Sequence, residues 1–177
     1  MKFDPENFLP NWVPGAATYL HANMSPNAIV VEWGAGASTI WLAKQVPNGF
    51  VVAAEHTKEW FDKVWKHAQY HTNIGLMKVP EVGLTYSQAP LRTCSDRQTV
   101  YIIDGLFRPR CFELAYGVAD EGDIIVMDDA LDYMTEFAEV EGMKDWESFK
   151  EPHPYAGTPK KDGTPHPDTK ETWIWVV

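Results

Sequence analysis

The amino-acid sequence predicts an α/β fold in which helices cover both faces of a mostly parallel sheet. Short apolar runs alternate with amphipathic stretches along the chain, and acidic residues recur where the apolar runs end. Strands that alternate with helices are joined by crossovers, which place helices on both faces of a parallel sheet. The 177 residues fit a single domain, 1–177, with an N-terminal segment at 1–26 and a long irregular loop at 151–170.

The first half of the chain contains the clearest elements. Residues 28–33 (AIVVEW) predict a strand, because near-continuous apolar character suits burial on both faces. A helix is expected over 38–46, with Ser38 at or near its N-cap. A second strand is expected at 50–54 (FVVAA). From Thr57 onward, apolar residues recur on one face, which is typical of an amphipathic helix.

The second half continues the alternation less regularly. The remaining expected elements are a weak third strand at 74–79, a fourth strand at 100–103, a helix over 111–118, a fifth strand at 123–127, a helical stretch at 133–140 and a closing strand at 172–177. Residues 80–98 are polar and permit no assignment. The loop at 151–170 is rich in Pro, Gly, Lys and Thr, and loops of this length inside a domain are usually functional or mobile.

Composition and charge argue against several classes of protein. The formal net charge is -10, which disfavours a nucleic-acid binder, because such proteins contact phosphates through Lys and Arg. No window approaches the roughly 18 apolar residues of a membrane span, and the N-terminus lacks the apolar core of a signal peptide. Cys94 and Cys111 do not have the spacing of metal ligands. These observations predict a reduced, cytoplasmic, acidic protein with no membrane partner.

The most informative stretch is VVEWGAGAST, residues 30–39, at the end of the first expected strand. Gly34 and Gly36 allow the backbone to turn sharply and to approach a ligand without a Cβ in the way. The N-terminus of the next helix offers free N–H groups and a positive dipole, which suit an anion. Glu55 lies 21 positions after Gly34, where an acid at the end of the second strand can bind ribose hydroxyls. The pattern therefore predicts a ligand with an adenosine-like ribose.

Two cofactor classes use a loop of this kind. A nicotinamide dinucleotide site requires G-x-G-x-x-G, and Thr39 stands where the third glycine would be. S-Adenosylmethionine carries an ammonium group on its methionine end, and Glu32, two residues before the first glycine, fits that charge. The charge pattern therefore favours S-adenosylmethionine.

Acidic residues mark the ends of the expected strands. They are Glu32, Glu55, Asp104, Asp128 and Asp129. The carboxyl ends of parallel strands share one edge of the sheet, and ligands of such sheets bind there. Together these residues predict one shared site.

Several further stretches follow one another in a characteristic order. EWGAGAST is followed by IWLA, then by AEH at 54–56, by YIIDGLFRPRCFELA at 101–115 and by GDIIVMDD. In this order they resemble the class I S-adenosylmethionine-dependent methyltransferases, and in particular an O-methyltransferase subgroup similar to the glucuronoxylan methyltransferases. The resemblance covers roughly residues 28–130. It implies a three-layer Rossmann-like sandwich whose seven-stranded, mostly parallel sheet has an antiparallel C-terminal strand.

The resemblance also implies a set of site residues. Those expected to bind the cofactor are Glu32, Gly34, Ala35, Gly36, Ser38, Thr39, Glu55, His56 and Asp104. Those expected to take part in catalysis are Asp104, Arg108 and Asp128.

A metal site is a further possibility that the resemblance raises. In catechol-type O-methyltransferases, acidic and amide side chains at the ends of strands four and five bind a divalent cation, and Asp104, Asp128 and Asp129 match these positions. Carboxylate oxygens suit Mg²⁺ or another divalent cation, which would lower the pKa of a substrate hydroxyl. The catechol-type family has a lysine three residues after the first of these aspartates. This sequence has Phe107 at that position, and the next residue is Arg108, which is permanently charged. Two hypotheses stay open: a metal site, or carboxylates that bind substrate directly or support the structure.

The predicted activity is methyl transfer from S-adenosylmethionine to a hydroxyl of a small-molecule or carbohydrate acceptor. Such a reaction depends mainly on positioning, which explains why the sequence shows no catalytic triad. Two alternatives remain open. One is an NAD(P)-dependent oxidoreductase on a Rossmann sheet, and the other is a non-catalytic methyltransferase-like binding module.

Overall fold

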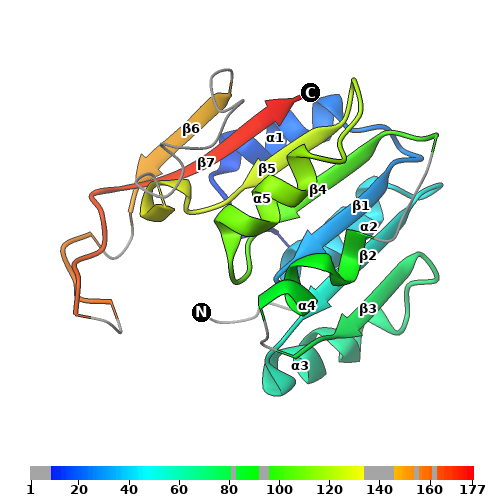
Figure 1. Cartoon of the computed structure of the whole chain (residues 1–177), viewed down its shortest axis with the longest axis horizontal. Coiled ribbons are helices and arrows are strands. Elements are labelled where there is room, and N and C mark those ends of the chain that lie inside the picture. Colours follow the sequence, from blue (N-terminus) through cyan, green and yellow to red (C-terminus); the bar gives the residue numbers. More distant parts are fainter. Residues whose placement is uncertain (1–8, 81–82, 92–95, 134–145, 154–155, 161–162) are drawn as a thin grey trace.

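Seven strands form a single mixed sheet at the centre of the protein (Figure 1). The computed structural model describes the chain except residues 1–8, 81–82, 92–95, 134–145, 154–155 and 161–162. The strands are β1 Ile29–Trp33, β2 Phe50–Glu55, β3 Ile74–Lys78, β4 Thr99–Ile103, β5 Ile124–Met127, β6 Glu147–Pro152 and β7 Thr169–Val176. Their order is β3-β2-β1-β4-β5-β7-β6; β1 to β5 pair in parallel, and β7 runs antiparallel to β5 and β6. The predicted fold class is confirmed.

Helices cover both faces of this sheet. Among the described residues the α-helices are α1 Pro14–Asn23, α2 Ala37–Gln45, α3 Lys58–Ala68, α4 Gly83–Gln88 and α5 Arg108–Tyr116, and the 3-10 helices are η1 Ala89–Leu91 and η2 Ala130–Tyr133. Figure 1 shows α1, α2 and α3 on one face of the sheet and α4 and α5 on the other. None of the described helices combines the length and the apolar character needed to cross a membrane.

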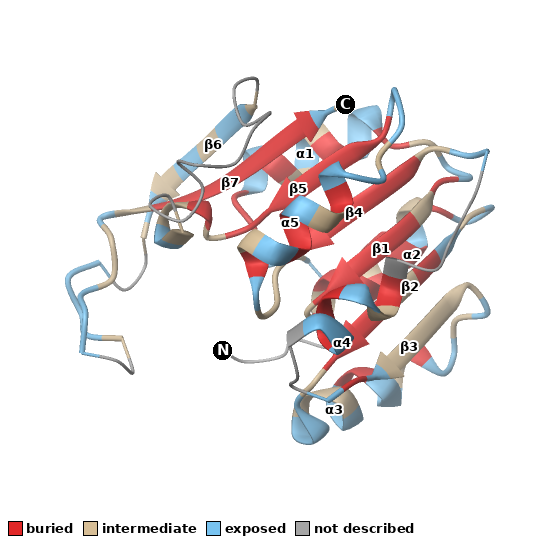
Figure 2. Ribbon diagram, in the orientation of Figure 1, coloured by how far each residue is buried: buried red, intermediate tan, exposed pale blue. Residues whose placement is uncertain are grey.

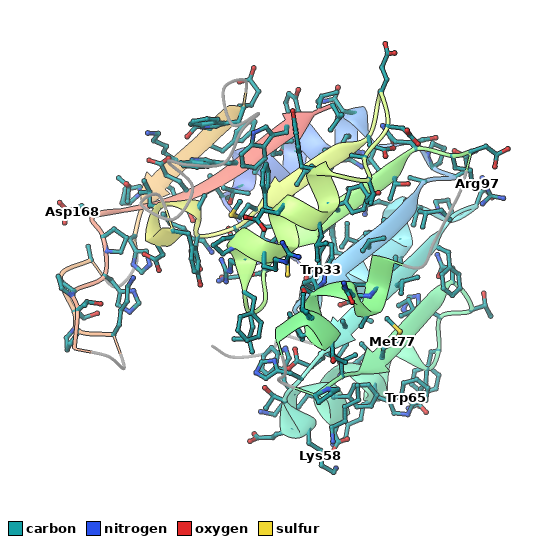
Figure 3. The ribbon with its side chains drawn as sticks, viewed as in Figure 1. Trp33, Lys58, Trp65, Met77, Arg97 and Asp168 are labelled. Atoms are coloured by element: carbon teal, nitrogen blue, oxygen red, sulfur yellow. The ribbon has the colours of Figure 1, made fainter. Side chains whose placement is uncertain are left out.

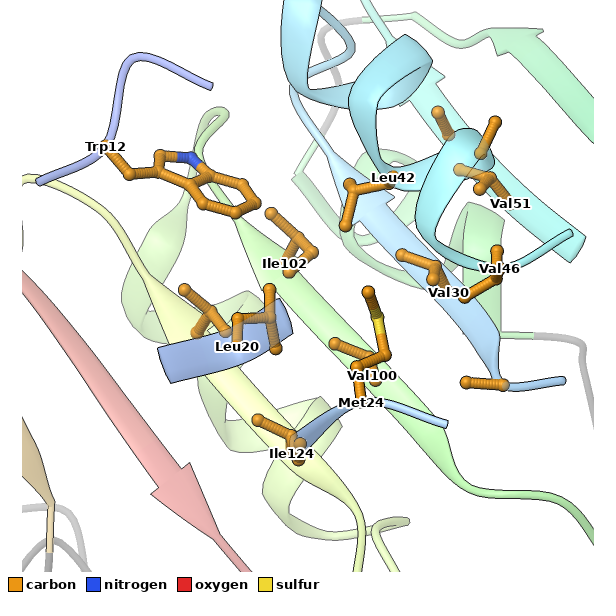
Figure 4. Packing of buried hydrophobic residues seen from close by; sticks show 14 of the residues in the cluster. Trp12, Leu20, Met24, Val30, Leu42, Val46, Val51, Val100, Ile102 and Ile124 are labelled. Atoms are coloured by element: carbon orange, nitrogen blue, oxygen red, sulfur yellow. The ribbon is translucent and has the colours of Figure 1, made fainter. Parts of the chain in front are cut away.

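Each face of the sheet has its own apolar core, and the central strands between them are buried (Figure 2). On one face, Leu20 of α1 lies over β4 and β5, in the same cluster as Ile102 and Ile124 (Figure 4). On the other face the core is rich in aromatic rings, and the ring centroids of Phe112 and Trp175 lie 4.7 Å apart. Burial on both sides explains why the strand sequences are almost continuously apolar.

The strand register places the predicted acidic residues at one edge of the sheet. Trp33, Ala54, Ile103 and Met127 lie in one row across four neighbouring parallel strands. Glu32 comes one position before this row, and the other acidic residues at strand ends follow it. The expectation that these acidic residues share one edge is therefore confirmed.

Two regions contain helices that the sequence did not predict. The segment 1–26 includes α1, which begins with Pro14 and buries Ala16 and Leu20. Short helices depend mainly on tertiary packing, so their local sequence pattern can be weak. Helices α4 and η1 lie in the stretch that had no assignment. Of the helical stretch predicted at 133–140, all but the first residue lies outside the described residues.

The C-terminal loop is shorter than predicted, because β6 extends to Pro152 and β7 begins at Thr169. The predicted closing strand is β7, and it pairs with β6 in antiparallel orientation. Within the loop, Lys160 forms an ion pair of 2.6 Å with Asp132 of η2. Asp168 marks the point at which the loop joins β7 (Figure 3).

Candidate functional site

A cavity of about 700 Å³ lies at the carboxyl edge of the parallel strands. Its lining comprises residues 9–11, 34–38, 55–57, Trp60, 104–106, Arg108, 128–129 and Tyr133. This volume is typical of sites for cofactors and small molecules. The structure brings together most of the predicted site residues here, and only Glu32 and Thr39 lie outside the lining.

Gly34 and Gly36, the two glycines of the first loop, differ in whether the fold would accept a side chain there. Gly34 has a φ of +93°, which favours glycine, and a Cβ there would lie 2.7 Å from the main-chain carbonyl of Asp104. Gly36 has an extended φ of -163°. A Cβ on Gly36 would make only ordinary contacts, 3.7 Å from Ser38 and 3.8 Å from Trp60. Because the fold tolerates a side chain at Gly36, its absence there suits a ligand that approaches the loop closely.

The Glu32 side chain is fully buried beneath this loop. Its two carboxyl oxygens accept hydrogen bonds from Ser38 at 2.5 Å and Thr39 at 2.6 Å, and the Thr39 hydroxyl accepts one from the Gly36 N–H at 2.9 Å. Burial raises the pKa of Glu32 to about 8, although the two hydroxyls act in the opposite direction. Glu32 therefore fixes the loop to the start of α2, and its contact with the ammonium group of a ligand stays a prediction.

Trp60 of α3 holds the loop from the cavity side. Its indole N–H donates a hydrogen bond of 2.6 Å to the main-chain carbonyl of Ala35. Trp60 is one of the apolar residues expected on one face of the helix that follows Thr57. Residue type alone does not show that the polar edge of its ring faces a site. Trp60 is therefore a site residue that the sequence pattern did not identify as such.

Glu55 and His56, at the end of β2, also line the cavity. The Thr57 N–H donates to Oε1 of Glu55 at 2.6 Å, which fixes the carboxylate at the end of β2. Nδ1 of His56 lies 3.2 Å from the same oxygen and is buried, but it makes no hydrogen bond with the described residues. A carboxylate at the wall of the cavity fits a ligand that carries hydroxyl groups, such as a ribose.

At the end of β5, the Asp128 side chain is only 2% exposed. Its Oδ1 accepts a hydrogen bond of 2.7 Å from the Thr172 hydroxyl, and its Oδ2 lies 2.8 Å from the Lys170 ammonium. Burial raises the pKa of Asp128 to about 7, reinforced by the charges of Asp104 and Asp129 and opposed by Lys170. Lys170 was not predicted as a site residue, because it was assigned to the irregular loop rather than to a strand.

Arg108, at the start of α5, joins the ends of β4 and β5. Its guanidinium donates hydrogen bonds to the main-chain oxygens of Gly105 at 3.1 Å, of Asp104 at 3.2 Å and of Asp128. It also pairs with the Asp104 carboxylate at 3.2 Å and lies over the ring of Tyr133. These contacts give Arg108 a positioning role at the cavity floor, and its part in catalysis stays a prediction.

The acidic residues at the strand ends do not fit a divalent-cation site. Among the residues that the structure describes, no three His, Cys, Asp or Glu side chains form a group that could hold a metal ion. Cations of the protein face the carboxylates instead, with Lys170 at Asp128 and Arg108 at Asp104. The geometry therefore favours the second hypothesis, in which these carboxylates bind substrate or support the structure.

Comparison with known proteins finds the fold but no close relative. No protein-family profile matches the sequence, and no curated protein matches it. Solved structures do match the fold. An rRNA methylase from Streptococcus thermophilus has a TM-score of 0.61 at 11% identity, over 94% of this chain and 96% of that chain. A precorrin-6y C5,15-methyltransferase from Geobacter metallireducens has a TM-score of 0.61 at 15% identity, over 92% and 87% of the two chains.

A third structure adds a bound ligand. It is a Streptococcus mutans protein, assigned as a methyltransferase and solved in complex with S-adenosylhomocysteine (SAH), with a TM-score of 0.62 at 11% identity, over 94% of this chain and 97% of that chain. The likeness extends over nearly the whole length of each chain. The chain therefore has the fold of the class I methyltransferases.

Proposed function

We propose that this protein binds S-adenosylmethionine at the carboxyl edge of its sheet and transfers the methyl group to a hydroxyl of a small-molecule or carbohydrate acceptor. The observation that carries the proposal is the loop at 34–38. There Gly36, which has no Cβ, lines a cavity of about 700 Å³ that the carboxylate at the end of the next strand also lines. A glycine loop before a helix and a carboxylate at the end of the next strand suit an adenosyl cofactor with an amino-acid tail.

Different parts of the cavity suit different parts of the cofactor. The N-terminus of α2 would hold the methionine carboxylate, because the N–H groups of the first helical turn and the helix dipole favour an anion. Glu55 and His56 would bind the ribose hydroxyls. The hydrogen bonds of Glu32 and Thr39 keep the loop in the shape that this placement needs.

The cofactor would supply a sulfonium methyl group. Transfer breaks the bond from sulfur to the methyl carbon while the acceptor oxygen forms a bond to that carbon, and the acceptor proton leaves to solvent. The contribution of the protein is to hold the two reactants in line, and such positioning supplies a large part of the rate enhancement of two-reactant steps. Arg108 and Lys170 serve this purpose by fixing the ends of β4 and β5.

The remainder of the cavity would receive the acceptor. It is formed by residues 9–11, Leu106, Asp129 and Tyr133, which combine apolar and acidic surface. A small polar acceptor suits such a surface. Carboxylates at the cavity, together with the net charge of -10, disfavour nucleic acid, because they repel phosphates.

Ligand-dependent thermal unfolding tests the proposal. S-Adenosylmethionine and SAH should each raise the melting temperature in a concentration-dependent manner, because a ligand that binds only the folded state stabilises it. NADH and NADPH, at the same concentrations, should leave the melting temperature unchanged. A rise with a nicotinamide dinucleotide and none with the two adenosyl compounds would overturn the proposal in favour of an oxidoreductase.

A further inference from the structure

The three acidic residues beside the proposed acceptor site differ in their exposure and in the distance to their partners within the protein. Asp128 is 2% exposed, and both of its oxygens have close partners, Thr172 at 2.7 Å and Lys170 at 2.8 Å. Asp104 is 24% exposed and forms an ion pair of 3.2 Å with Arg108. Asp129 is the most accessible of the three, at 34%, and its ionic contacts are the longest.

Asp129 lines the cavity, and among the described residues it has no close partner for its charge. Its Oδ1 lies 3.6 Å from Lys170 and its Oδ2 lies 3.8 Å from Arg108, both beyond hydrogen-bond distance. Both cations are themselves held by shorter contacts elsewhere, Lys170 by Asp128 and Arg108 by main-chain oxygens. The carboxylate of Asp129 therefore retains the capacity to accept hydrogen bonds from a ligand.

The backbone of Asp129 supports the same interpretation. Its φ of +46° lies in the left-handed region, which is uncommon for a residue other than glycine. Among the described residues, only Phe107 shares this property, and Phe107 directly precedes Arg108. Strain of this kind persists where the surrounding structure imposes it, and it is found preferentially at functional sites.

The exposure of the charges defines which ligands this part of the cavity can take. Lys170 and Arg108 have side-chain exposures of 5% and 11%, so both positive charges are largely buried, whereas the carboxylates of Asp104 and Asp129 are 24% and 34% exposed. A ligand group that enters beside Tyr133 therefore meets negative charge. Donors of hydrogen bonds are favoured there, and anionic groups are repelled.

We propose that Asp129 contacts the methyl acceptor, and that the acceptor presents there a hydroxyl or amine hydrogen-bond donor and no anionic group. The inference rests on the proposed function, because it takes the cofactor to occupy the neighbouring half of the cavity. The Asp129 carboxylate accepts a hydrogen bond from an N–H or O–H of the acceptor, next to the methyl group that is transferred. Asp128, Lys170 and Arg108 hold the strand ends on which Asp129 stands.

Sinefungin and SAH together test this proposal even though the identity of the acceptor is not known. Sinefungin is an analogue of S-adenosylmethionine in which a carbon that carries an amino group replaces the sulfonium and its methyl group. Its ammonium therefore projects where the transferred methyl would be, whereas SAH has nothing at that position. The ratio of the two dissociation constants, measured by calorimetry, reports the charge that faces the methyl group.

The wild-type protein should bind sinefungin about tenfold or more tightly than SAH, because the ammonium gains a charge-assisted hydrogen bond. In Asp129→Asn the preference should fall by about tenfold, with the Kd of SAH unchanged. Asparagine is nearly isosteric and tolerates a positive φ, so the fold should be kept. The matched control is Asp132→Asn, three residues along, whose carboxylate pairs with Lys160 outside the cavity lining; it should keep the wild-type ratio.

The outcomes separate this inference from the proposed function. An unchanged ratio in Asp129→Asn, or wild-type protein that binds SAH at least as tightly as sinefungin, would overturn the role of Asp129 while the cofactor site stands. Loss of SAH binding in Asp129→Asn would also overturn it, by assigning the residue to the fold or the cofactor. Failure of the wild type to bind either compound would overturn the proposed function, and the role of Asp129 with it.

Discussion

The Lys170 ammonium and the Asp128 carboxylate form an ion pair of 2.8 Å whose side chains are 5% and 2% exposed. Nζ of Lys170 also donates to the main-chain oxygen of Asn11. One buried cation thus joins the end of β5, the start of β7 and the N-terminal segment at the edge of the cavity. An ion pair so far from solvent makes the protein depend on both partners, because removal of either charge leaves the other buried without its closest partner.

Replacing Lys170 should therefore destabilise the whole domain. Lys170→Met keeps a side chain of similar length but removes the charge, and we expect a loss of about 3–5 kcal/mol in the free energy of unfolding. Urea denaturation followed by circular dichroism measures this loss. The control is Lys63→Met, which removes an exposed partner of Glu59 at 2.8 Å and should cost far less, because solvent screens an exposed pair. Equal losses in the two variants would contradict a structural role for the buried pair.

The buried carboxyl group of Glu32 should make stability depend on pH. Its pKa is raised from 4.5 to about 8, so between these values the folded protein holds a proton that the unfolded chain has released. Raising the pH over this interval must then lower the free energy of unfolding, by at most about 1.4 kcal/mol per pH unit for this one group.

Glu32→Gln removes this ionisation and keeps a side chain that can hydrogen-bond with Ser38 and Thr39. The fall in stability between pH 5 and 8 should become shallower in this variant, although Asp128, whose pKa is about 7, contributes a fall of the same sign. Chemical denaturation of both proteins at several pH values compares the slopes. Identical slopes would show that Glu32 does not hold a proton in the folded protein.

The close approach of Gly34 to Asp104 should be visible in a pair of alanine variants. Gly34 and Gly122 have nearly the same φ, +93° and +90°, but a Cβ on Gly34 would lie 2.7 Å from main-chain atoms whereas a Cβ on Gly122 would meet nothing within 4 Å. Gly122→Ala should therefore lose about 1 kcal/mol of stability from backbone strain alone. Gly34→Ala should lose about 1–3 kcal/mol more from the steric contact. Thermal and urea unfolding measure the difference, and equal losses would refute the packing of the two loops.

Glu55 should contribute affinity for the ribose without affecting the fold. Glu55→Gln retains an oxygen to accept the Thr57 N–H but lacks the charge, so SAH should bind about tenfold more weakly, as expected for the loss of a charge-assisted hydrogen bond. Glu59→Gln, on the exposed surface of α3 near its N-terminus, should bind SAH like the wild type. Fluorescence titration of the three proteins is sufficient, and equal affinities would remove Glu55 from the site.

The sequence predicted those features that depend on local pattern. Apolar runs identified the buried strands, because parallel strands are buried on both faces. The acidic residues at the ends of four of these runs identified the edge of the sheet at which the cavity lies. The loop at 34–38 could also be predicted, since Gly34 adopts a conformation that few other residues tolerate.

Features that depend on long-range contacts could not be predicted in this way. Lys170 and Asp128 are 42 positions apart, and the helix α1 is held by packing against β4 and β5 rather than by its own periodicity. The direction in which the Glu32 side chain points could not be predicted either. A carboxylate at a strand end is compatible with a ligand contact and with an internal hydrogen-bond network, and only the positions of Ser38 and Thr39 distinguish them.

Calorimetric titration of SAH into the wild type and into Gly36→Ala tests the central claim most directly. The fold accepts a Cβ at Gly36, so both proteins should unfold at similar temperatures. The wild type should bind one SAH per chain, and Gly36→Ala should bind it at least about tenfold more weakly, because the methyl group occupies the surface that the ligand approaches. No heat of binding in the folded wild type, or equal affinities in the two proteins, would contradict a cofactor site at this loop.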